Sequence, residues 1–223
     1  MSEQLHPVPA EEWVQNTEET PMQEGEIISG LRRGDQTAWT TLYDTYSVRI
    51  WRYVAKLVGP NADAVGDIVQ ESVLAAAQSA QSFNDSKGTL WQWLTGIAHN
   101  SVSKYWRVEQ QANRLQRLLE ANAGDGPPLG AVDPPKEWVT MLLARSEQLP
   151  GENMERQELA DIVRAAMAQL PADYADLLTA KYVDELSLAE IQRQTGSSSD
   201  AVRSKLVRAR SEFRDVFQRM TND

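Results

Sequence analysis

Apolar residues recur at steps of three and four along almost the whole chain, and this helical period constrains the fold more than any other feature. One run passes through Ala38, Leu42, Tyr46, Ile50 and Tyr53, and residues at such steps line one face of an α-helix. Similar runs lie before and after it, separated by glycine or proline. No stretch alternates apolar and polar residues as a half-buried strand would. The sequence therefore predicts an all-α protein.

Turn-forming residues divide this helical pattern into two blocks. The stretch Gly124-Asp125-Gly126-Pro127-Pro128 interrupts regular structure and is typical of a linker. We therefore expect two small helical domains joined by a flexible segment. The predicted parts are a disordered acidic arm at 1–24, a first helical domain at 25–107, an acidic Pro/Gly-containing linker at 108–155 and a second helical domain at 156–223.

The residue types exclude several classes of protein. The chain has no cysteine and two histidines, so neither a disulfide, nor a thiolate metal site, nor an imidazole cluster can form. No glycine-rich phosphate motif and no pairing of a nucleophile with a base is visible, and we predict no enzyme activity, metal or cofactor. No apolar run approaches the roughly 20 residues of a membrane span, and the acidic start is unlike a signal peptide. We expect a cytoplasmic protein without membrane insertion.

Charge is distributed unevenly along the chain. The net charge is −10, whereas the stretch 201–219 holds six Lys or Arg against two acidic residues. A single basic helix in an acidic protein is the pattern expected where phosphates meet one face of the molecule. A solvated helix face explains the charge equally well when the charge is taken alone.

The basic stretch lies within a helix-turn-helix pattern. Ser187-Leu188-Ala189-Glu190 is a capping box that predicts a helix start. Thr195-Gly196-Ser197 supplies a turn, and Ser198 or Ser199 can cap the next helix. An ordinary helical hairpin kept soluble by its cations is the alternative interpretation.

The second helix of this pattern has an apolar back and a polar, cationic front. The predicted buried stripe is Val202, Leu206, Ala209 and Phe213. Such a front suits the major groove of DNA, where Arg reads guanine and small polar residues contact other base edges. The predicted DNA-binding residues are Ser199, Asp200, Arg203, Ser204, Lys205, Val207, Arg208 and Arg210.

Three stretches of the C-terminal block together resemble a known family. They are Leu170–Tyr174, Tyr182–Ile191 and Gly196–Arg210. They are similar to the C-terminal domain of bacterial sigma factors of the small extracytoplasmic-function (ECF) class, which binds the minus-thirty-five promoter element. The resemblance assigns the front of the second helix to that element.

The N-terminal block resembles the same family independently. The stretch 67–71 is similar to the acidic helix that grips the clamp helices of the largest polymerase subunit, which implies polymerase contacts by Asp67, Gln70 and Glu71. The stretches 88–94, 97–100 and 105–107 are similar to the loop and helix that read the minus-ten element, through base stacking and hydrogen bonds. The implied minus-ten contacts are Trp91, His99, Asn100, Lys104, Tyr105, Trp106 and Arg107.

The resemblance implies a transcription initiation factor that binds the clamp helices and flap of core RNA polymerase, melts the minus-ten region and anchors at the minus-thirty-five element. A possible anti-sigma factor is its implied regulator. The acidic linker suits a cation-lined polymerase path or is a plain spacer. The acidic arm is hypothesised to fold back on the basic helix or to dock a regulator. A stand-alone helix-turn-helix regulator that does not melt promoters is the alternative.

Overall fold

The computed structural model describes residues 24–121 and 152–222. Within these two ranges the regular elements are all helical and no strand occurs, which confirms the all-α prediction. The predictions for the arm at 1–23 and for the linker between 122 and 151 lie outside the described residues.

Four α-helices form the N-terminal domain. Side-chain caps explain two of the helix starts, because Asp35 accepts a hydrogen bond from the Thr37 amide at 2.9 Å and Asn61 accepts one from the Ala64 amide at 3.1 Å. The elements are α1 (Glu24–Arg32), α2 (Gln36–Val58), α3 (Ala62–Gln78), the 3-10 turns η2 (Ala80–Ser82) and η3 (Asp85–Lys87), and α4 (Leu90–Ala121).

Helices at the ends of both domains extend beyond the limits expected from the sequence. Glu24 belongs to α1, where its carboxylate accepts hydrogen bonds from the Leu90 amide at 3.2 Å and the Tyr46 hydroxyl at 3.3 Å. A carboxylate at the first amide of α4 is favoured by the helix dipole. α4 continues to Ala121, well past residue 107, and α6 begins at Glu152, before residue 156.

The C-terminal domain contains the expected helix-turn-helix. The capping box is present, because the Ser187 hydroxyl accepts from the Glu190 amide at 3.2 Å and the Glu190 carboxylate accepts from the Ser187 amide at 2.7 Å. Gly196 has a φ of 66°, the left-handed conformation that ends many helices. The elements are α6 (Glu152–Gln169), α7 (Ala172–Leu178), the π-helical turn η4 (Thr179–Val183), α8 (Leu188–Thr195) and α9 (Ser199–Asn222).

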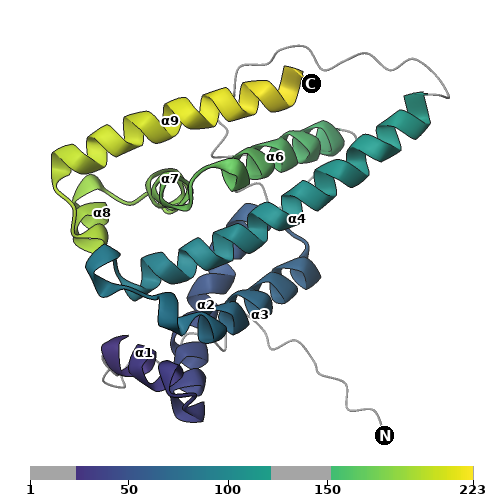
Figure 1. Ribbon diagram of the computed structural model, residues 1–223. Coiled ribbons are helices and arrows are strands. Elements are labelled where there is room, and N and C mark those ends of the chain that lie inside the picture. Colours follow the sequence, from purple (N-terminus) through teal and green to yellow (C-terminus); the bar gives the residue numbers. More distant parts are fainter. Residues whose placement is uncertain (1–23, 122–151, 223) are drawn as a thin grey trace, which may run out of the picture.

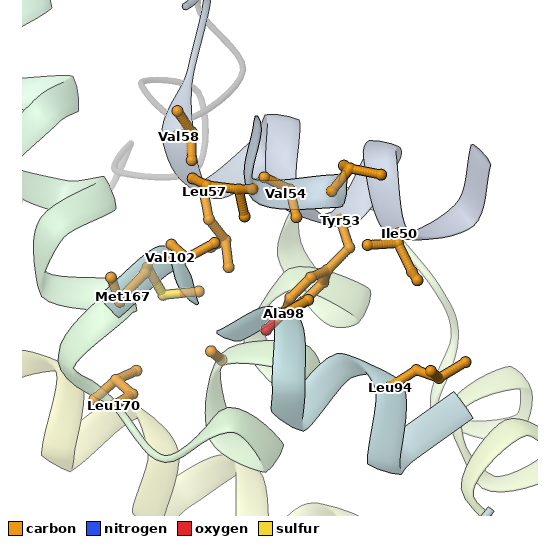
Figure 2. Close-up of a cluster of buried hydrophobic side chains, with 14 of the residues drawn as sticks. Ile50, Tyr53, Val54, Leu57, Val58, Leu94, Ala98, Val102, Met167 and Leu170 are labelled. Carbon is orange, nitrogen blue, oxygen red and sulfur yellow. The ribbon is translucent and has the colours of Figure 1, made fainter. Parts of the chain in front are cut away.

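The two domains pack directly against each other. Figure 1 shows α6 between α9 on one side and α4 on the other, and residues 163–168 of α6 are all buried. In Figure 2, Tyr53 and Leu57 of α2 and Val102 of α4 lie in one cluster with Met167 and Leu170. One apolar core therefore joins the two domains, with α4 in the interior of the stack and α9 at its edge.

Candidate nucleic-acid interface

The front of α9 is open to solvent. The predicted stripe Val202, Leu206, Ala209 and Phe213 is buried, which confirms the expected back of the helix. Val207 is 58% exposed in the middle of the opposite face, an unusual place for a large apolar side chain. The other exposed residues of this front are Asp200, Arg203, Ser204, Arg208 and Arg210.

Two cations of α9 are held by other parts of the C-terminal domain. Lys205 Nζ lies 2.8 Å from Asp173 Oδ2 at the start of α7, and Arg210 Nη1 donates to the Tyr182 hydroxyl of η4 at 3.1 Å. Arg203 and Arg208 have no ion pair within the described part of the chain. Among the predicted DNA-binding residues, these two are therefore the cations most available to a phosphate or a base edge.

The start of α9 is capped by Ser198. Its hydroxyl accepts from the Ala201 amide at 3.3 Å, so the first of the two candidate caps is the one used. Ser199 is the first residue of the helix and is partly buried. Ser199 is thus less accessible than the rest of the predicted front.

Two of the predicted minus-ten contacts lie in the interior. Trp106 is 7% exposed, and its indole nitrogen donates to the Leu57 carbonyl at 2.8 Å, so the ring is a core residue and does not stack on a base in this arrangement. The spacing carries this signal, because positions 90, 94, 98, 102 and 106 recur every four residues and all are buried.

His99 is buried between the two domains and is 2% exposed. Nε2 lies 2.8 Å from the Leu170 carbonyl, and Nδ1 lies 3.0 Å from the Tyr53 hydroxyl. Burial lowers the pKa of His99, while the Leu170 carbonyl and the Asp173 carboxylate act to raise it. In this arrangement His99 is a neutral interface residue and cannot meet a phosphate.

The remaining minus-ten residues fall into two groups. Asn100, Lys104 and Arg107 are exposed and share one face of α4, because they are four and three residues apart. Trp91 and Tyr105 are half-buried: the Arg49 guanidinium lies 3.8 Å from the centre of the Trp91 ring, and Tyr105 packs edge-on against Trp106. An accessible polar strip thus remains on α4, and the partly covered aromatic rings lie on other faces of the same helix.

The predicted polymerase contacts lie together on the outer face of α3. Asp67, Gln70 and Glu71 are exposed, and Glu71 is 3.3 Å from Lys104 of the polar strip on α4. Leu74, which the sequence reasoning missed, is 49% exposed and continues the same face at a spacing of three from Glu71. The face therefore combines negative charge with an apolar contact.

Within the described ranges no helix is long and apolar enough to cross a membrane. The same residues contain no group of three or more His, Cys, Asp or Glu side chains placed to hold a metal ion.

Comparison with known proteins finds a matching family description for each of the two domains. Residues 42–112 match the family described as Sigma-70 region 2, and residues 160–213 match Sigma-70, region 4. The first match covers the outer face of α3 and the polar strip of α4. The second ends at residue 213, beyond the exposed front of α9.

Individual relatives cover most of the chain. The ECF RNA polymerase sigma factor SigW of Bacillus subtilis (strain 168) is 25% identical over 189 residues, which is 84% of this chain and 92% of SigW. SigL of Mycobacterium tuberculosis (strain ATCC 25618 / H37Rv) is 26% identical over 179 residues, covering 80% and 88%. A solved structure of CnrH in complex with the cytosolic domain of CnrY is 16% identical with a TM-score of 0.41, covering 85% of this chain and 94% of CnrH.

Proposed function

The chain belongs to the ECF sigma factors, transcription initiation factors that bind core RNA polymerase and direct it to promoters, and we propose which of its surfaces performs each task. Members of this family are not enzymes, so the polymerase carries out the chemistry. In this proposal α9 binds the minus-thirty-five element, α4 binds the minus-ten element and α3 binds the polymerase.

The exposed front of α9 is the observation that carries the proposal. It presents Arg203 and Arg208 on either side of Val207, on the second helix of a capped helix-turn-helix. The recognition helix of such a motif lies in the major groove, where Arg donates two hydrogen bonds to guanine and an apolar side chain contacts the thymine methyl. Lys205 and Arg210 support the orientation of α9 through Asp173 and Tyr182.

Duplex binding tests the assignment of α9. Arg203→Ala should weaken binding to a minus-thirty-five duplex by about 1–3 kcal/mol if it reads a base, or lower the salt slope by about one if it meets phosphate. Arg219→Ala removes the same charge from the far end of α9, where the side chain is also exposed, and is the matched control. Equal losses in the two variants would show that only total charge matters.

The polar strip on α4 supports a contact with the minus-ten element. Asn100, Lys104 and Arg107 offer an amide and two cations along one exposed face of α4, and the half-buried rings of Trp91 and Tyr105 lie on other faces of the same helix. Amide and cationic groups bind base edges and phosphates, and aromatic rings stack on unpaired bases. The buried His99 and Trp106 do not belong to this surface in the arrangement described.

The outer face of α3 supports a contact with the clamp helices of the polymerase. Its carboxylates complement a cationic partner. Leu74 supplies an apolar side chain that is exposed to solvent in the free protein and could be buried by that partner. Glu71→Lys should weaken core polymerase binding at least tenfold in a pull-down or fluorescence titration, as reversal of an interface charge typically does. Glu158→Lys makes the same change at an exposed position of α6 and should leave the affinity unchanged.

A promoter-opening assay tests the function as a whole. The purified chain, added to core polymerase and promoter DNA, should give run-off transcripts and permanganate-reactive thymines in the minus-ten region. A stand-alone helix-turn-helix regulator would bind the duplex and open nothing.

Control by an anti-sigma factor is typical of the family. We also propose that the C-terminal domain contacts the polymerase flap. A protein that covers α3 or α9 would be detected by its competition with core polymerase or duplex DNA.

A further inference from the structure

On the front of α9, cations without ion pairs lie on either side of an exposed apolar side chain. Arg203 and Arg208 flank Val207, which is 58% exposed, and neither arginine has an ion pair within the two described ranges. Between residues 199 and 210 the only acidic residue is Asp200. A segment that covers this surface should therefore carry negative charge and a large apolar side chain.

Residues 1–23, which we call the acidic arm, have the complementary composition. The arm contains five glutamates and no Lys or Arg. Four of these glutamates form the pairs Glu11-Glu12 and Glu18-Glu19, and Trp13 is the only Trp, Tyr or Phe of the arm. Two acidic pairs and a tryptophan thus match two arginines and a valine in charge and in apolar character.

The acidic arm joins α1 close to the turn that leads into α9. It precedes Glu24, whose carboxylate accepts a hydrogen bond from the first amide of α4. Glu24 lines a groove together with Thr195 and Ser197, which belong to the turn between α8 and α9. Arg32 and Lys87 line the same groove. The path from the end of the arm to α9 therefore runs past positive charge, which favours a glutamate-rich segment.

The acidic arm is also long enough to lie along the front of α9. An extended chain spans about 3.3 Å per residue, so the eleven steps from Glu24 back to Trp13 span up to about 36 Å. Arg203 and Arg208 are separated by only about 7.5 Å along the helix axis, at 1.5 Å per residue. The front of α9 faces away from its buried back, so the arm has to pass around the turn at Ser197, and this length allows it.

The polar strip on α4 is a poorer site for the acidic arm. Lys104 of this strip is 3.3 Å from Glu71. Asp67 and Glu71 are both exposed on the adjoining outer face of α3. Because like charges repel, these carboxylates disfavour the approach of further glutamates. The front of α9 is therefore the better match.

We propose that the acidic arm binds the front of α9 and competes there with the minus-thirty-five element. In this contact the glutamates take the place of phosphates beside Arg203 and Arg208, and Trp13 covers Val207. The inference rests on the proposed assignment of α9 to DNA. Because the arm is tethered to α1, the contact is intramolecular and does not depend on protein concentration. Salt should weaken it, because the charges involved are exposed.

Cross-linking detects the contact without DNA. The chain has no cysteine, so Gln15→Cys in the acidic arm and Ser204→Cys on the exposed front of α9 introduce a unique pair for a short thiol-reactive reagent. The comparison protein has the same two cysteines and a neutralised arm. The neutralised arm carries the substitutions Glu11→Gln, Glu12→Gln, Glu18→Gln and Glu19→Gln.

The arm with its glutamates should give joined monomers at low salt, at least about threefold faster than the neutralised arm does. Equal rates for the two arms would overturn the proposal. Joined dimers in place of joined monomers would assign the arm to a second copy of the chain, and would overturn the intramolecular contact.

Duplex binding tests the competition. The chain with the neutralised arm and no introduced cysteine should bind a minus-thirty-five duplex at least about threefold more tightly than the wild type at low salt, and this gain should shrink as salt is added. The control changes the net charge by the same amount at four exposed positions elsewhere. Its substitutions are Asp44→Asn, Asp63→Asn, Glu158→Gln and Asp215→Asn.

The control should gain less affinity than the neutralised arm. Equal gains would show that only the total charge matters and would overturn the competition. If none of these proteins binds the duplex, the assignment of α9 to DNA fails, and the cross-linking rates still decide whether the acidic arm contacts α9.

Discussion

The two helices assigned to DNA recognition are presented in opposite ways. α9 lies at the edge of the stack, with an apolar back against its own domain and Val207 58% exposed on its front. α4 lies in the interior. One side packs in the core of its own domain, and a second side, which carries the 2% exposed His99, is covered by the other domain. A helix at an edge can bind a partner as it stands, whereas a helix within a stack depends on the layer above it.

The largest expected effect is the difference in the free energy of unfolding between substitutions on the back and on the front of α9. Phe217 is fully buried, and Phe217→Ala should lower the free energy of unfolding by about 3–5 kcal/mol through the cavity it leaves. Val207→Ala, on the exposed front, should change it by less than about 0.5 kcal/mol. Chemical denaturation followed by circular dichroism measures both, and similar losses would mean that the front of α9 is also packed.

The next effect separates the two DNA surfaces. Arg208→Ala should weaken binding of the minus-thirty-five duplex about tenfold and leave binding of a single-stranded minus-ten oligonucleotide unchanged. Lys104→Ala should do the reverse, because its ion pair with Glu71 is exposed and too weak to keep the ammonium group from a phosphate. Fluorescence anisotropy with the two separate DNAs measures this. Parallel losses by either variant would contradict two independent surfaces.

A pH dependence should distinguish the covered helix from the open one. Burial lowers the pKa of His99 below its ordinary 6.5, so the docked domains favour the neutral ring. This stabilisation is present above pH 6.5 and is lost as the pH falls through the lowered pKa. Two cysteines introduced as Lys56→Cys and Asp184→Cys would join the two domains when cross-linked. The yield of this cross-link should therefore decrease as the solution is acidified, relative to the yield for a cysteine pair within one domain.

The control for the pH effect is His99→Gln, which keeps a side-chain donor but does not titrate in this range. Burial raises the pKa of Asp176, which lies in the C-terminal domain and faces Arg49 and Lys56 of α2. This carboxyl favours the docked state at low pH and loses that effect as the pH rises through its raised pKa, opposite in sign to His99. The difference between wild type and His99→Gln isolates the histidine, and identical pH profiles would count against its role.

The smallest effect concerns a single methyl group. If Val207 contacts a thymine methyl, replacing that thymine by deoxyuridine should cost the wild type about 0.8 kcal/mol, or about fourfold in affinity. Val207→Ala should show a smaller loss at the same position. A wild type insensitive to every such replacement would remove Val207 from the recognition surface.

The helix-turn-helix could be predicted because its determinants are local. The capping box at Ser187, the glycine at 196 and the apolar stripe of α9 all lie within about one helical turn of the residues they organise, and each is observed. The burial of Trp106 was also readable from its spacing of four from Val102 and Ala98. Its aromatic character suggested base stacking instead.

The docking of the domains could not be predicted in the same way. Its contacts join residues far apart in the chain, such as Lys56 with Asp184 and His99 with Leu170. His99 is polar, and of its two neighbours in the sequence one is buried and the other exposed. The surrounding sequence therefore does not mark it as an interface residue. Whether a polar side chain on a helix meets DNA or another helix depends on which layer covers it.

Energy transfer between fluorophores at positions 56 and 184, introduced as Lys56→Cys and Asp184→Cys in this cysteine-free chain, tests most directly whether the two domains are held together in the free protein and separate on the polymerase. Transfer should be high in the free protein and unchanged by a minus-thirty-five duplex alone. It should fall when core polymerase is added and stay low on a promoter. Low transfer in the free protein, or high transfer that persists on the polymerase while the promoter is open, would contradict this account.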